Sequence, residues 1–128
     1  MKENQNPLSP HLQVYKWQIS SLLSISHRIV GVLNILLISI FCFWILSLLL
    51  GESAYQFSQK FFSSFFGKFF IISSCWTFSF HILNEIRHLF WDLGYGFELK
   101  TAKISGVLVF IGSFVLAIIF YLIGRTLI

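Results

Sequence analysis

Three long apolar runs organise the chain. The first covers residues 29–50, where Asn34 is the only strongly polar side chain, and the third covers residues 104–123 and is almost purely apolar. The second run, residues 69–90, is as long as the first but includes several ionisable side chains. A helix over residues 29–50 would be about 33 Å long, which is enough to cross a hydrocarbon core of about 30 Å. The pattern therefore predicts an all-α membrane protein with three transmembrane helices.

The segments between the apolar runs are expected at the membrane surface. The first loop, residues 51–68, contains Phe61, Phe62, Phe65 and Phe66, which we expect on the membrane interface. The second loop covers residues 91–103. The serine-rich stretch of residues 17–28 either begins the first helix within the headgroup region or lies on the surface just before it. Residues 1–128 are interpreted as a single domain.

The distribution of basic residues predicts the orientation. One side of the membrane would carry six of them: Lys2, Lys16, Arg28, Arg87, Lys100 and Lys103. The other side would carry three: Lys60, Lys68 and Arg125. By the positive-inside rule the N-terminus faces the cytoplasm or the mitochondrial matrix. An aromatic belt of Tyr15, Trp17, Trp91 and Tyr95 is expected on the same face.

Composition excludes an aqueous fold. Hydrophobic residues make up 56% of the chain and charged residues 11%, whereas a soluble domain is about a quarter charged. The formal charge of +4 comes from residues that flank the apolar runs. The chain has no basic run with interleaved aromatics, so nothing in it predicts nucleic-acid binding. Cys42 and Cys75 form no CxxC pair and are interpreted as small apolar residues. The polar N-terminus is neither a signal peptide nor a transit peptide, so we expect no cleaved presequence.

His81 is the ionisable residue expected deepest in the membrane. It lies twelve residues from Phe69 in the second apolar run, about 18 Å along the helix axis, which places it in the inner half of the bilayer. His88 follows on nearly the same helical face, about 10 Å nearer the inner surface. An ionisable side chain at mid-bilayer costs roughly 2.5–3.5 kcal/mol on insertion scales. A neutral imidazole there could ligate haem iron or, equally well, bond to a neighbouring helix.

A six-coordinate haem at His81 would require a second chain. Two axial nitrogens lie about 4 Å apart across the iron, given metal–nitrogen bonds of about 2 Å. His81 and His88 are on one face of one helix and too far apart to do this together. His11 and His27 precede the first apolar run and are expected near or outside the surface. The second ligand would therefore come from a partner subunit.

A second polar cluster is expected at the inner interface. Ser24, His27 and Arg28 stand at i, i+3 and i+4 and would share one helical face. The second helix would bring three more polar residues to the same depth: Arg87, His88 and Asp92. Such a set suits an amphipathic ligand with a polar head, as a quinone has, or the propionates of a haem. Snorkelling and the positive-inside bias alone would explain the two arginines.

Three motifs in order resemble one family. Residues 9–17, SPHLQVYKW, resemble an SPHLxxYxW opening; residues 24–31, SISHRIVG, resemble S-I-x-H-R-x-x-G; and residues 81–94, HILNEIRHLFWDLG, resemble H-x-x-N-G-I-R-H-L-x-W-D-x-G. These are the motifs of the large cytochrome b membrane-anchor subunit of succinate dehydrogenase, the SdhC family of complex II. Motifs, spans and length together cover essentially the whole chain.

The resemblance implies a set of roles. His81 would be the axial ligand of haem b from this subunit, and a small anchor subunit would supply the other ligand. Ser24, His27 and Arg28 would lie at the ubiquinone site, and the candidates for propionate contact or proton delivery would be His27, Arg28, His88 and Asp92. FAD and iron–sulfur clusters would belong to the flavoprotein and iron–sulfur subunits, in a bacterial plasma membrane of alphaproteobacterial type or a mitochondrial inner membrane. The chain itself has no cysteine set for a cluster.

Glu85 departs from the family pattern, because the family usually has glycine after the asparagine of the third motif. A carboxylate one turn from His81 would crowd a macrocycle or need a basic partner. The first hypothesis is an electron-transfer subunit without activity of its own. The second, which Glu85 keeps open, is a purely structural anchor without haem. A third, a free-standing transmembrane cytochrome, generally needs four intramembrane histidines.

Overall fold

The computed structural model describes residues 16–127, which are helical and contain no strand. The elements are α1 (Ile19–Leu49), α2 (Glu52–Ser63), α3 (Phe65–Asp92) and α4 (Leu99–Leu127). Three of these helices, α1, α3 and α4, are long and apolar enough to cross a membrane. The expected all-α architecture with three spans is confirmed. Residues 9–15 of the first motif, with His11 and Tyr15, lie outside the described residues, as does Lys2.

Each long helix extends beyond the apolar run that predicts it. The largest difference is at α1, which begins at Ile19 rather than at residue 29. The serine-rich stretch therefore begins the first helix, which was one of the two expectations. A helix that crosses the hydrocarbon core can continue into the headgroup zone, where polar side chains have no hydropathy cost. As a result Ser24, His27 and Arg28 belong to the same continuous helix as Asn34.

The first loop contains a helix that the sequence argument did not anticipate. Ser64 separates α2 from α3 and caps α3, since its hydroxyl accepts a hydrogen bond of 3.1 Å from the backbone N–H of Gly67. A Cβ at Gly67 would clash with the backbone of Phe61 and Phe62, so the sharp α2–α3 corner requires glycine there. Phe62 packs on Phe41 and Phe70. The other four phenylalanines of this loop, Phe57, Phe61, Phe65 and Phe66, stay exposed, as a membrane interface would require.

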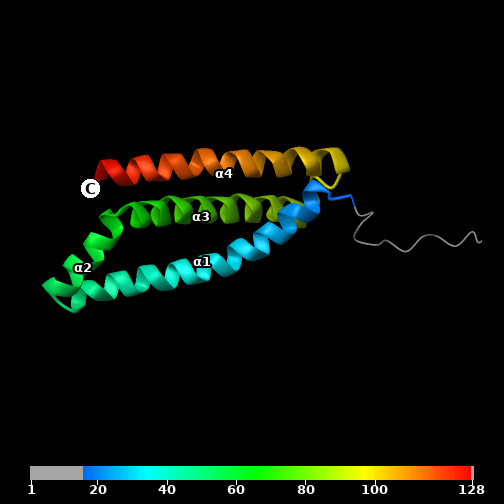
Figure 1. The fold of residues 1–128 in the computed structure, drawn as a ribbon. Helices are drawn as coiled ribbons and strands as arrows, with labels where there is room; N and C mark the ends of the chain where they lie inside the picture. The colour runs from blue at the N-terminus through cyan, green and yellow to red at the C-terminus, as the bar shows by residue number, and fades with distance from the viewer. Residues whose placement is uncertain (1–15, 128) are drawn as a thin grey trace, which may run out of the picture.

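Helix α3 lies between α1 and α4 (Figure 1), and it packs more extensively on α4 than on α1. Small side chains make the close approach to α4 possible: Ser79 and Ser113 are fully buried. A Cβ at Gly112 would lie 3.4 Å from Leu83 Cδ1. Small residues at helix contacts are typical of membrane bundles, where packing rather than water exclusion drives association.

The distribution of polarity is the reverse of a soluble core. The buried hydrophobic residues are Leu23, Val30, Phe80, Val109 and Ala117. Buried polar residues outnumber them: Asn34, Ser74, Thr77, Ser79, Asn84, Arg87 and Ser113. Large apolar side chains such as Ile35 and Phe43 cover the outside of the bundle. Only a lipid environment accommodates such a surface, so the chain is an integral membrane protein.

Candidate functional site

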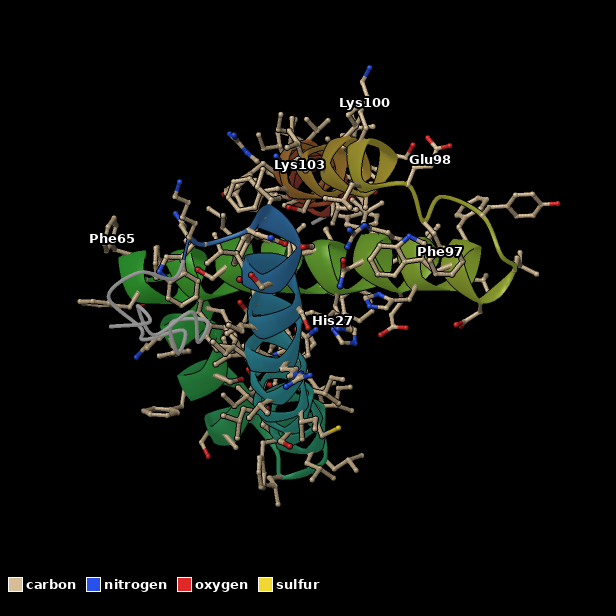
Figure 2. The ribbon with its side chains drawn as sticks, turned by 90° about the vertical axis from the view of Figure 1, so that its right-hand side faces the viewer. His27, Phe65, Phe97, Glu98, Lys100 and Lys103 are labelled. Carbon is tan, nitrogen blue, oxygen red and sulfur yellow. The ribbon has the colours of Figure 1, made fainter. Side chains whose placement is uncertain are left out.

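Three histidines meet where α1 crosses α3. The ring of His27, from α1, stacks on that of His81, from α3, with centroids 4.4 Å apart and planes inclined by 18°. His27 also stacks on His88, with centroids 5.4 Å apart. Figure 2 shows His27 at this crossing of the two helices. The expected depth of His27 near the membrane surface stays a prediction, but its packing between the other two imidazoles was not expected.

Glu85 completes the cluster. It stands one turn after His81 on α3, and its carboxylate Oε1 lies 3.0 Å from Nε2 of His27 and 4.0 Å from Nε2 of His81. The short contact to His27 is at ion-pair distance, but the imidazole nitrogen is not aligned for a hydrogen bond. More than half of the Glu85 side chain is exposed. The family position that usually carries glycine thus supplies a carboxylate to the centre of the site.

The two ring nitrogens of His81 have different surroundings. Nδ1 is buried and has no hydrogen-bond partner. It faces Gly31 of α1, where a Cβ would lie 3.4 Å from Cε1 and 4.0 Å from Nδ1 of His81. Nε2 lies on the side of Glu85, where the carboxylate is exposed. The imidazole is therefore held against α1 by its Nδ1 edge and presents its Nε2 edge outward.

Asn84 and His88 support the cluster from α3. The Asn84 side chain is fully buried, and neither its amide nitrogen nor its oxygen has a hydrogen-bond partner within residues 16–127. Its backbone carbonyl lies 2.8 Å from Nδ1 of His88. That contact fixes the His88 ring beside His27 and Trp91. Orphaned buried amide groups are rare in protein interiors, and this one is enclosed by residues of the chain itself.

Ser24, Arg28 and Asp92 lie around the cluster rather than in it. All three side chains are exposed, and no hydrogen bond or ion pair involves them among the described residues. Ser24 and Arg28 share the His27 side of α1 by their spacing. Asp92 is the last residue of α3. The three remain available to a ligand or partner at this end of the bundle.

Arg87 does not join the other interfacial residues, contrary to the sequence argument. It is buried against α4, where its Nε donates to Ser105 Oγ at 3.0 Å and its Nη2 donates to the Ala102 carbonyl at 3.0 Å. Its guanidinium carbon lies 4.0 Å from the centre of the Trp91 ring. Snorkelling to the surface does not describe it either. Arg87 is a structural link between α3 and α4.

The donor set suits haem ligation by His81 alone. A neutral imidazole with one edge held against the protein and the other edge open is the arrangement of an axial ligand. His27 cannot be the opposite ligand, because its ring stacks face to face on His81 and leaves no space for iron between them. The Glu85 carboxylate would have to turn away from Nε2, and its exposure permits this. The residues thus fit the group, provided that Glu85 moves.

Comparison with known proteins decides the family. Residues 2–120 match the model of the succinate dehydrogenase/fumarate reductase transmembrane subunit. The chain belongs to this family. It is 37% identical over 118 residues to the succinate dehydrogenase cytochrome b556 subunit of Rickettsia felis, with 92% of each chain covered. It is 33% identical over 119 residues to the cytochrome b556 subunit of Paracoccus denitrificans, covering 93% of this chain and 92% of the relative.

A third relative widens the range of hosts. The succinate dehydrogenase cytochrome b560 subunit of Marchantia polymorpha is 40% identical over 127 residues, covering 93% of this chain and 90% of the relative. The predicted resemblance is confirmed, and the chain is a membrane component of complex II. A bacterial plasma membrane or a mitochondrial inner membrane is the location that agrees with these relatives and with three apolar helices.

Proposed function

We propose that this chain is the cytochrome b anchor of a succinate dehydrogenase, which ligates haem b through His81 and forms part of the ubiquinone-reducing site through Ser24, His27 and Arg28. It would hold the iron–sulfur and flavoprotein subunits at the membrane and have no activity alone. The membership of the family supports the anchor role. The observation that carries the haem assignment is the His81 imidazole, with Nδ1 buried against Gly31 and Nε2 facing the open side.

His81 would provide one axial nitrogen and a small anchor subunit the other. Among residues 16–127, the stacked pose of His27 and the position of His88 about two turns along α3 from His81 offer no second ligand. When bound, haem b would accept and release single electrons. The chain's own residues would orient the group: His81 by its fixed ring, and His27, Arg28, His88 and Asp92 by contact with propionates or delivery of protons.

Ser24 and Arg28 would bind the quinone head. A hydroxyl and a guanidinium on adjacent turns of α1 can each donate a hydrogen bond to a quinone oxygen, and both are free to do so among residues 16–127. As negative charge develops on those oxygens during reduction, the arginine would stabilise it more strongly than the neutral ring. The apolar flanks of α1 would accommodate the isoprenoid tail.

Substitutions at Ser24 and Arg28 test the quinone assignment in the assembled complex. Arg28→Leu is expected to lower succinate:ubiquinone reduction about 10–100-fold, because it removes a charge-assisted hydrogen bond. Ser24→Ala is expected to lower it several-fold. Oxidation of succinate by an artificial acceptor should be unchanged. Ser26→Ala, two residues away on a different face of α1, and Arg28→Lys serve as controls. Equal loss of both activities in Arg28→Leu would contradict the assignment.

A second candidate function is a purely structural anchor without haem. The observation that favours it is Glu85, whose carboxylate lies 4.0 Å from the nitrogen of His81 that would bind iron. In that case the His27–Glu85 pair would be the final state of the cluster rather than a contact that haem displaces. The two candidates differ in one spectroscopic property, the b-type absorbance of the purified assembly.

A further inference from the structure

A groove at the α2 end of the bundle is separate from the histidine cluster. It encloses about 550 Å³ between α2, α3 and α4. Figure 1 shows α2 and the C-terminal end of α4 at the same end of the molecule, opposite the first residues of α1. Its lining is mixed, because it includes the apolar side chains of Ile71 and Phe120 as well as the polar side chains of Gln59 and Tyr121. The groove thus has the two-part character of an amphipathic ligand.

Two cations, Lys68 and Arg125, line this groove. Lys68 lies in the first turn of α3 and Arg125 in the last turn of α4, and both side chains are exposed. No acidic side chain lines the groove, and neither cation forms an ion pair with a residue in the described part of the chain. Because both stand at the ends of membrane-crossing helices, they lie at the depth of the lipid headgroups.

We propose that this groove binds one anionic phospholipid. The phosphate would lie between Lys68 and Arg125, with Tyr121 and Gln59 as further hydrogen-bond donors, and one acyl chain would follow Ile71 and Phe120 toward the bilayer centre. Gly124 provides the space for it, since a Cβ there would have nothing within 4 Å. A lipid with net negative charge is favoured over a zwitterionic lipid, whose ammonium would repel the two cations.

The test uses the whole complex, delipidated in detergent and titrated with dioleoyl-phosphatidylglycerol or dioleoyl-phosphatidylcholine while native mass spectrometry counts retained lipids. The wild type should retain the anionic lipid at concentrations where the zwitterionic one dissociates. Lys68→Gln with Arg125→Gln should weaken that retention about 30-fold, the effect of two interfacial cations. Lys60→Gln, a cation of the same end that does not line the groove, is the matched control.

Gly124→Leu separates the acyl-chain contact from charge. It fills open space and keeps both cations, so it should lower lipid retention while leaving the fold and quinone reduction intact. It also tests the proposal if the double variant is not produced. Excess inorganic phosphate should not displace the lipid. Three results would overturn the proposal: equal retention of both lipids by the wild type, full retention by Gly124→Leu, or release of a companion subunit by the double variant, which would make this face a protein interface.

Discussion

Two charged residues of α3, Glu85 and Arg87, stand two positions apart and have opposite surroundings. Arg87 faces α4, is buried, and directs its guanidinium at Ser105, the Ala102 carbonyl and the Trp91 ring. Glu85 faces α1 and the outside, close to two imidazole nitrogens that have no aligned hydrogen bond. The guanidinium of Arg87 has hydrogen-bond partners within the chain, whereas no hydrogen bond to the carboxylate of Glu85 is formed among residues 16–127.

This difference distinguishes two faces of α3. We call the α4 side, where Arg87 has hydrogen-bond partners, the finished face, and the α1 side, where Glu85 lies, the unfinished face. Charged and polar groups in a membrane are expensive unless they have partners. On the α4 side of α3 this chain provides hydrogen-bond partners for Arg87, although the indole nitrogen of Trp76, which packs on Phe114 of α4, is buried without one. On the α1 side it leaves an orphaned His81 nitrogen and an orphaned Asn84 amide. We infer that the α1–α3 face receives a cofactor and a second subunit, whereas the α3–α4 face only stabilises the fold.

The largest expected effect is at the unfinished face. His81→Ala should abolish the b-type absorbance of the assembled complex, because we propose the His81 imidazole as this subunit's ligand to the iron. The measurement is the reduced-minus-oxidised spectrum, with flavin content as the measure of assembly. His88→Gln is the control, since the His88 ring is bound to the Asn84 carbonyl and should not be needed for ligation. An unchanged band in His81→Ala would disprove the assignment.

An intermediate effect is expected at the finished face. Arg87→Leu removes two charge-assisted hydrogen bonds and leaves the Ala102 carbonyl with one acceptor site unused, at a cost of roughly 1.5–3 kcal/mol per bond. The temperature at which half of the complexes lose this subunit in detergent should fall, while the haem content of surviving complexes stays normal. Lys103→Gln, an exposed cation of α4, should have no effect. Selective haem loss in Arg87→Leu would contradict the division between the two faces.

The smallest effect concerns the departure from the family. Glu85→Gly removes a carboxylate that must leave Nε2 of His81 before iron can bind there. An exposed ion pair contributes about 0.2–1 kcal/mol, so haem loss to a scavenging apoprotein should slow by up to about fivefold. Glu85→Gln, which keeps the shape, separates charge from size. Faster haem loss in Glu85→Gly would mean that the carboxylate helps to hold the group.

Hydropathy sufficed to predict the spans, because lipid requires long apolar runs and the three runs are unambiguous. It did not find the helical start at Ile19 or the helix α2, since both carry too many polar residues for a hydropathy signal. The capping serine at position 64 and Gly67 were the available local signals for the α2–α3 corner.

The candidate site was only partly predictable. The face of Arg87 could have been predicted from helix geometry. Arg87 is six residues after His81, which is a rotation of one full turn plus about 240° and therefore places it on a different face. The stack of His27 on His81 could not be predicted, because it depends on the position of α1 along α3. A single sequence does not reveal the relative register of two packed helices. Gly31 was visible in the second motif, but its contact with His81 was not.

The most direct measurement is the reduced-minus-oxidised absorbance spectrum of the native assembly purified through this chain. We predict a b-type band, with haem equimolar to the flavin that copurifies. A flavin-containing assembly that shows no such band would contradict it, and the His27–Glu85–His81 cluster would then be a purely structural contact.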